Sequence, residues 1–147
     1  AYGVYSYAAI AVDLEIDKLT YEVRLRKVTT AQDIGKAINP LLAEGQIIGG
    51  STQGLGWALL EEPLFKDGVM SNASFTNYVI PTSLDTPPFE VMLVEQPYSR
   101  GPFGAKGLGE LPMDIPGPAV AAAVKHATGR LIATLPQTPE RISRALQ

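Results

Sequence analysis

Four glycines crowd into the nine residues from Gly101 to Gly109, and this density constrains the fold more than any other feature of the sequence. Because glycine adopts backbone conformations and allows close approaches that side chains forbid, we predict a loop wrapped tightly around something other than protein. The stretch contains Lys106 and leads directly into a single carboxylate, Glu110. We interpret Glu110 as the candidate reacting group, at the mouth of a rigid pocket. An ordinary surface loop with a solvated carboxylate is the alternative.

This loop does not match the motifs that bind nucleotide phosphates. It contains no G-x-G-x-x-G followed by a helical pattern, and Lys106 precedes Gly107 rather than serine or threonine. A nucleotide P-loop is therefore not predicted. After a short connection, the Ala-rich stretch Pro118 to Thr128 predicts a helix that ends at Gly129 in a left-handed conformation.

A second glycine-rich stretch predicts a helix from Pro40 to about Leu60, with Asn39 as its N-cap. Each glycine inside a helix costs up to about 1 kcal/mol relative to alanine. Five lie in this one: Gly45, Gly49, Gly50, Gly54 and Gly56. Either the helix packs backbone to backbone against another element, or its glycine face lies against a ligand, and the spacing leaves both open. Gln46 and Gln53 share one face of this helix.

The N-terminal region predicts a long antiparallel hairpin. Apolar residues alternate with polar ones from Ser6 to Ile16, Asp17 to Thr20 forms the turn, and the alternation returns from Tyr21 toward Val28. The polar face of this hairpin either faces solvent or docks against another domain.

The remaining elements complete a single α+β domain with an antiparallel or mixed sheet. The predicted features are an Asp-Gly hairpin turn within 65–69, an extended segment 74–80, a central strand 89–95, a short strand 130–134, a last helix 138–145, and Trp57 in the core. One domain over residues 1–147 is also what this length predicts.

Composition excludes several functional classes. The net charge of −3 and the scattered basic residues offer no face for nucleic acid. No apolar run approaches the length of about 20 residues that a membrane span needs, and no signal peptide is visible, so we expect a cytoplasmic protein. The absence of cysteine excludes disulfides, thiolate zinc sites and iron–sulfur ligation within the chain. The single histidine, His126, fits a structural role in the last turn of a helix.

Three blocks, in order, closely resemble the molybdopterin-binding large subunit of the xanthine dehydrogenase/aldehyde oxidase family of molybdenum hydroxylases. They are 33–62 (with DIGKAINP and EGQIIGGSTQGLGWALLEE), 78–91 (with YVIP and TPPFEV), and 104–112 (GAKGLGELP). The last block resembles the loop that bears the family's catalytic glutamate. The resemblance runs from about Tyr7 to Arg141, and three ordered blocks are more specific than any one alone.

The resemblance implies a role for each site residue. Glu110 matches the general base, Leu108 and Gly109 match backbone positions close to the cofactor, Gln46 matches an amide that hydrogen-bonds it, and Gln53 is a weaker candidate. The glycine-rich helix would face the cofactor. In this family the metal is held by the pterin and has no protein ligand, so no metal-ligating residue is expected here. The implied reaction inserts water-derived oxygen and transfers hydride to Mo=S.

The resemblance also implies that much of the machinery lies elsewhere. We expect residues 1–147 to be a C-terminal fragment of the molybdopterin-binding subunit, or conceivably a separate small subunit, inactive alone. The expected cofactor is a molybdenum–pyranopterin, as molybdopterin or its cytosine dinucleotide form, bound only with the rest of the subunit. Iron–sulfur clusters and FAD are expected on other domains or subunits. The substrate would be a small molecule: a purine, an aldehyde or another N-heterocycle. The alternatives are a carbon monoxide dehydrogenase-type subunit, slightly disfavoured by the Leu-Pro after Glu110, or a non-catalytic assembly module.

Overall fold

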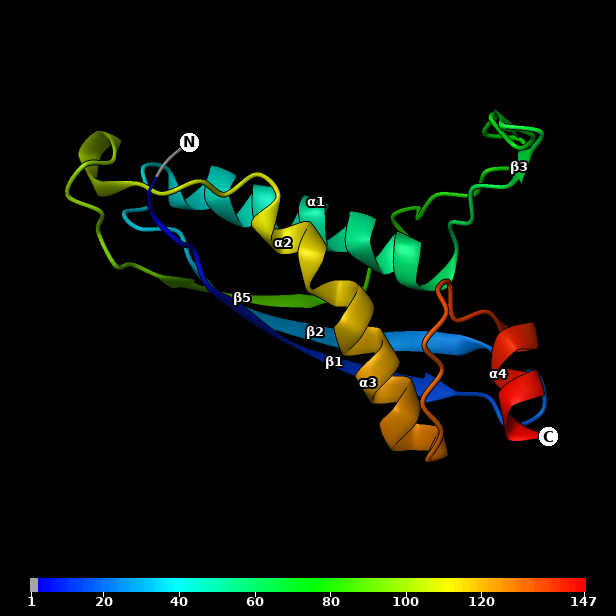
Figure 1. The fold of residues 1–147 in the computed structure, drawn as a ribbon. Helices are drawn as coiled ribbons and strands as arrows, with labels where there is room; N and C mark the ends of the chain where they lie inside the picture. The colour runs from blue at the N-terminus through cyan, green and yellow to red at the C-terminus, as the bar shows by residue number, and fades with distance from the viewer. Residues whose placement is uncertain (1–2) are drawn as a thin grey trace.

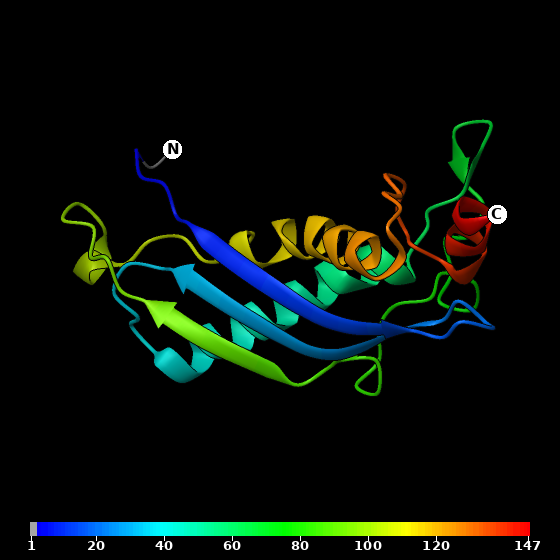
Figure 2. The same ribbon diagram turned by 90° about the horizontal axis from the view of Figure 1, so that it is seen from below.

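The computed structural model describes residues 3–147, which form two layers, a sheet and the helices that cover one of its faces (Figure 1). The sheet has the order β1-β2-β5, with strands β1 (Ala8–Ile16), β2 (Val23–Asp33) and β5 (Phe89–Val94). β1 pairs with β2 antiparallel, whereas β5 pairs with β2 parallel. The predicted α+β class is confirmed, with a mixed sheet. Figure 2, seen from below, shows the opposite face of the sheet without a covering helix.

The N-terminal hairpin forms as predicted. One carboxylate oxygen of Asp17 accepts hydrogen bonds from the backbone N–H groups of Leu19 and Thr20, both at 2.8 Å, which fixes the turn. The second strand continues beyond the predicted end at Val28 to Asp33, because its later residues pair with both neighbours. This extension carries the central strand to the candidate site.

Helix α1 (Pro40–Leu59) begins where the sequence predicted, and the side chain of Asn39 accepts a hydrogen bond of 3.1 Å from the N–H of Leu42. Its glycines divide into two groups. A Cβ atom on Gly54 would lie 2.6 Å from the carbonyl oxygen of Met113, whereas one on Gly45 or Gly49 would meet no atom within 4 Å. The packing interpretation therefore holds for part of the helix, whereas Gly45 and Gly49 have no neighbouring atoms on their Cβ side.

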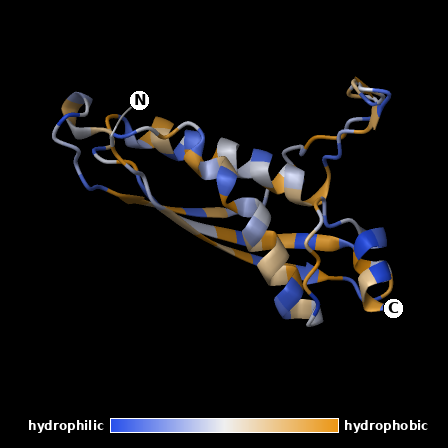
Figure 3. Cartoon of the chain, viewed as in Figure 1, coloured by the Kyte–Doolittle hydropathy of each residue, from blue (hydrophilic) through white to orange (hydrophobic). Residues whose placement is uncertain are grey.

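The partners of that packed face are α2 (Leu111–Asp114) and α3 (Pro116–Thr128). A Cβ on Gly50 would lie 3.0 Å from Pro112, and α3 ends at Gly129 with a φ of 73°, as predicted. The main core lies between the helices and the covered sheet face, with the buried residues Val28, Leu55, Ala58, Val120, Val124, Ile132 and Ile142. Figure 3 shows the matching alternation of apolar and polar residues along the strands.

The C-terminal helix α4 (Pro139–Leu146) is capped by Thr138, whose side chain accepts a hydrogen bond from the N–H of Arg141. Strands β3 (Phe65–Lys66) and β4 (Val69–Met70) form the predicted hairpin around Asp67 and Gly68, both with positive φ. No helix within residues 3–147 is both long enough and apolar enough to cross a bilayer.

Four details of the sequence prediction were wrong. Trp57 is 53% exposed instead of buried, because it is not among the buried residues of α1, which include Ile47, Leu55 and Ala58. The segment 74–80 forms turns, in which the carbonyl of Ser74 accepts hydrogen bonds from Asn77 and Tyr78, and residues 130–134 form no strand. Strand β5 is an edge strand rather than a central one: its apolar residues Met92 and Val94 lie exposed on the uncovered face.

Candidate functional site

The loop from Gln96 to Gly109 folds back onto the residues that follow strand β2. The carbonyl oxygen of Gly104 accepts a hydrogen bond of 2.9 Å from the N–H of Lys36, and the N–H of Lys106 donates to Ile34 at 2.9 Å. Between these contacts, Gly35 has a φ of 65°, and a Cβ atom there would clash with the Gly104 carbonyl. Glycine is therefore required at position 35 both by its backbone conformation and by the close approach of the loop.

A buried ion pair fixes the loop further. Lys106 Nζ lies 2.5 Å from Asp33 Oδ2 and also donates to the carbonyl of Tyr5 at 3.3 Å. Burial raises the pKa of Asp33, but the hydrogen bond from Lys106, the N–H of Gly35 and the positive charge of Lys106 outweigh it, and the pKa lies below its ordinary value. Lys106, the only lysine of the loop, therefore connects the loop to the end of strand β2.

Glu110 stands directly before α2, and its backbone carbonyl accepts a hydrogen bond of 2.9 Å from the N–H of Met113. Its side chain is exposed, and within residues 3–147 the carboxylate makes no hydrogen bond or ion pair. A cavity of about 260 Å³ adjoins the loop, but its lining does not include Glu110. Within this chain, the predicted base therefore lies on an open surface and not at the mouth of a closed pocket.

Gln46 meets the loop beside Glu110. Its side-chain Nε2 donates a hydrogen bond of 3.2 Å to the carbonyl oxygen of Gly109, 63 residues further along the chain. Leu108 is partly buried against Ile34 and its neighbours, which positions the backbone just before Gly109. Three predicted site residues, together with Glu110, are thus brought to one surface.

Gln53 is not part of this group. It is exposed on α1, seven residues beyond Gln46, which corresponds to about 10.5 Å along a helix axis. No hydrogen bond joins its side chain to the loop in the part of the chain that the structure describes.

The backbone around this surface is open. Cβ atoms on Gly107 and Gly109, like those on Gly45 and Gly49 of α1, would meet no atom within 4 Å. Among residues 3–147, the N–H groups of residues 107–110 have no acceptor. Unpaired N–H groups in succession on a glycine backbone form a surface suited to acceptor-rich or anionic ligands.

Sequence reasoning missed the contacts that hold this surface in place. Besides Lys106 and Asp33, Ser51 Oγ donates a hydrogen bond of 3.3 Å to the carbonyl of Pro112, behind Glu110. Ser51 is completely buried. In the sequence, Ser51 is recognisable only as a small polar residue between Gly50 and Gly54. Only the fold shows that it donates to the carbonyl of Pro112.

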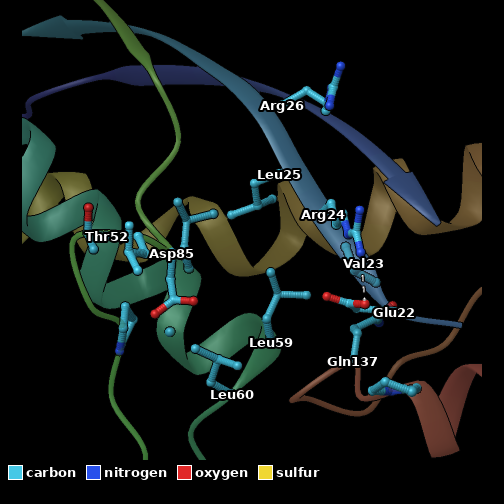
Figure 4. A pocket seen from close by; sticks show the side chains of 15 residues that line it. Glu22, Val23, Arg24, Leu25, Arg26, Thr52, Leu59, Leu60, Asp85 and Gln137 are labelled. Atoms are coloured by element: carbon cyan, nitrogen blue, oxygen red, sulfur yellow. Dashed lines mark hydrogen bonds and ion pairs between the residues drawn. The ribbon is translucent and has the colours of Figure 1, made fainter. Parts of the chain in front are cut away.

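A cavity of about 500 Å³ lies elsewhere, between β2, the end of α1 and the segment before α4 (Figure 4). The residues that line it come from Glu22–Arg26, the second half and end of α1, the segment 81–85 and the segment 137–139, and they include neither Glu110 nor Gln46. Its charged side chains already have partners: Arg24 pairs with Glu22 at 3.3 Å and Arg26 with Glu15 at 3.4 Å. Asp85 accepts hydrogen bonds from the backbone N–H and the hydroxyl of Thr82 at 2.8 and 2.7 Å. We therefore place the candidate site at the loop and not in this cavity.

Within the described residues, no cluster of three or more His, Cys, Asp or Glu side chains could hold a metal ion. The polar groups that gather at the loop are the Gln46 amide and backbone N–H groups, which donate hydrogen bonds, and the Glu110 carboxylate, which accepts them. Such a set suits an organic cofactor that carries its own metal ligands better than a bare metal ion.

Comparison with known proteins gives the family to which the chain is similar. Residues 1–87 match the family model described as the molybdopterin cofactor-binding domain. The chain is 40% identical over 139 residues to the xanthine dehydrogenase molybdenum-binding subunit of Escherichia coli. This alignment covers 93% of this chain and 18% of that protein.

Two solved structures have the same fold. The aldehyde oxidoreductase of Desulfovibrio gigas superimposes with a TM-score of 0.88 and 34% identity, over 97% of this chain and 16% of that one. The carbon monoxide dehydrogenase of Oligotropha carboxidovorans gives a TM-score of 0.86 and 30% identity, over 96% of this chain and 18% of that one. The chain thus spans less than a fifth of the length of these relatives.

Proposed function

Because the chain belongs to the molybdopterin cofactor-binding domain family, we propose that it forms one wall of the molybdenum–pyranopterin site of a hydroxylase. The observation that carries the proposal is the hydrogen bond of 3.2 Å from Gln46 to the carbonyl of Gly109. It joins the open glycine face of α1 to the residue before Glu110. An amide, an accessible backbone and a carboxylate therefore share one surface.

This surface fits the cofactor. A pterin and its phosphate are rich in hydrogen-bond acceptors, and the N–H groups of residues 107–110 are donors without an acceptor within residues 3–147. The bare Cα atoms of Gly107 and Gly109 would let the ligand approach the backbone closely. Gln46 and the backbone of Leu108 and Gly109 would hold the cofactor, whereas Gln53 would contribute only if the cofactor extended further along α1.

When bound, the cofactor supplies the two-electron acceptor and the water-derived oxygen with which an electron-poor carbon is hydroxylated. We assign Glu110 as the general base that takes up, on a carboxylate oxygen, the proton released in this step. Its carboxylate makes no internal hydrogen bond within residues 3–147, so both oxygens can accept the proton. General-base catalysis of this kind contributes roughly 10²–10⁴-fold to the rate.

The rest of the enzyme lies outside this chain in the proposal. The remainder of the molybdopterin-binding subunit would complete the site, and electrons would leave through iron–sulfur and flavin domains or subunits. The substrate would be a purine, an aldehyde or another N-heterocycle. Alone, the chain should bind little or no molybdenum, which metal analysis of the purified chain would test.

The decisive experiment replaces Glu110 with glutamine in the complete enzyme. Glu110→Gln keeps the size and hydrogen-bonding shape of the side chain but cannot take up the proton. We expect molybdenum content and substrate binding to be retained, while the rate of molybdenum reduction in a single turnover falls at least about 10²-fold.

Glu90→Gln is the matched control, because Glu90 pairs with Lys27 on the uncovered face of the sheet. This variant should reduce molybdenum at the parent rate. A normal single-turnover rate in Glu110→Gln, at equal molybdenum content, would favour a non-catalytic role for the loop.

A further inference from the structure

An apolar hollow adjoins the candidate site, and Glu110 is not among the residues that line it. It is the cavity of about 260 Å³ beside the loop, and we call it the apolar cradle. Its floor consists of Ile34, Ala37 and Ala43, which are buried and pack together as a small second core. Leu108 lines the cradle and is also the residue before Gly109, so the cradle is continuous with the proposed cofactor surface.

Large apolar side chains that face solvent in this chain lie at the edge of the cradle, beside the polar residues Lys36, Asn39 and Lys106. Ile38 and Leu42 line it and are 61% and 70% exposed, and their neighbour Leu41 is 78% exposed. Isolated exposed leucines are common on protein surfaces, but adjacent ones around a concave apolar floor are typical of an interaction site.

The cradle is held in shape by polar contacts at its border. Glu95 accepts a hydrogen bond of 2.8 Å from the N–H of Ala37 and pairs with Lys36 at 3.0 Å. The Asn39 cap fixes the first turn of α1, which carries Leu42. An apolar centre with an ion pair at its rim is the usual anatomy of a protein interface, and a preformed surface loses little entropy on binding.

We propose that an apolar segment from the remainder of the molybdopterin-binding subunit fills the apolar cradle and closes this side of the cofactor site. The occupant follows from two observations. The chain spans only 18% of the length of its relative from Escherichia coli, so most of such a subunit lies outside it. The cradle also shares Leu108 with the cofactor surface, so whatever covers it flanks the cofactor. The inference rests on the proposed place of the chain in a larger subunit, but not on the role of Glu110.

The test measures the accessibility of the edge in the complete subunit. Leu42→Cys and, separately, Ile38→Cys place a thiol on an exposed edge residue where little should disturb the fold, and the chain itself contains no cysteine. The rate of maleimide labelling is followed by peptide mass spectrometry, with the urea-unfolded subunit as the reference. We expect labelling of the folded subunit to be slower by at least about tenfold, with or without cofactor, because the thiol reacts only in locally opened molecules.

Three outcomes would overturn the proposal. Labelling as fast as in the unfolded reference would mean that the cradle is uncovered. Protection only in the cofactor-loaded subunit would identify the cofactor as the occupant. Protection that disappears on dilution would identify a second copy of the subunit. Because the cofactor-free protein is tested as well, failure here is distinguishable from failure of the proposed catalytic role.

Discussion

Lys106 and Asp33, 73 residues apart in sequence, form an ion pair of 2.5 Å in which their side chains are only 9% and 10% exposed. Asp33 is the last residue of the central strand, and Lys106 lies four residues before Glu110. The pair therefore connects the most firmly held element of the sheet to the loop that carries the proposed base.

Lys106→Met should destabilise the chain strongly, because it leaves the carboxylate of Asp33 buried without its partner. Breaking a buried pair in this way typically costs about 3 kcal/mol or more. Lys36→Met is the control, since Lys36 and Glu95 are 52% and 38% exposed, and exposed pairs contribute less than about 1 kcal/mol. Chemical denaturation of both variants measures the difference, and equal losses would show that the buried pair has no special role.

The same pair predicts how stability depends on pH. The pKa of Asp33 is lowered in the folded state, so its contribution is present above the unfolded pKa of about 3.9 and is lost as pH falls through the lower folded value. The difference in unfolding free energy between the parent and Asp33→Asn should stay constant near neutral pH and shrink below about pH 4. A difference that grows in acid would contradict this assignment.

The local elements of the fold were predictable because their signals are local. The Asn39 cap, the turn at Asp17 and the left-handed Gly129 each depend on a few neighbouring residues, and each was found as predicted. Strand β5 was misplaced for the opposite reason. Its apolar residues on both faces are typical of a central strand. This pattern indicates that both faces are apolar, but it does not show whether a second strand pairs with its free edge.

The candidate site was predictable only in part. The resemblance gave Glu110, Gln46, Leu108 and Gly109, which the fold gathers on one surface, whereas Gln53 lies apart from them. The ion pair between Lys106 and Asp33 could not be predicted, since each residue alone looks like an ordinary surface charge. Their burial depends on the loop folding back over Gly35, which is a property of the tertiary structure.

The two groups of glycines in α1 should respond oppositely to alanine. Gly54→Ala would place a Cβ 2.6 Å from the carbonyl of Met113 and 2.8 Å from Pro116, and overpacking of this kind costs about 1–3 kcal/mol. Gly49→Ala meets no atom within 4 Å, so helix propensity should stabilise the cofactor-free protein by about 0.5–1 kcal/mol. Unfolding free energies of the two cofactor-free variants test this, and a change of the same sign in both would be inconsistent with the division.

Gln46→Leu removes the hydrogen bond to the carbonyl of Gly109 while keeping a side chain of similar size. The bond is solvent-exposed, so stability should change by no more than about 1 kcal/mol. In the complete subunit we expect a clear loss of molybdenum per protein, measured by inductively coupled plasma mass spectrometry, because Gln46 both holds the loop and would contact the cofactor. Gln53→Leu is the matched control: it makes the same change on the same helix, at an exposed residue two turns away, and should retain the parent's molybdenum. Full molybdenum content in Gln46→Leu would mean that this hydrogen bond is only a contact within the chain and that Gln46 does not hold the cofactor. An equal loss in both variants would mean that the cofactor extends along α1 as far as Gln53.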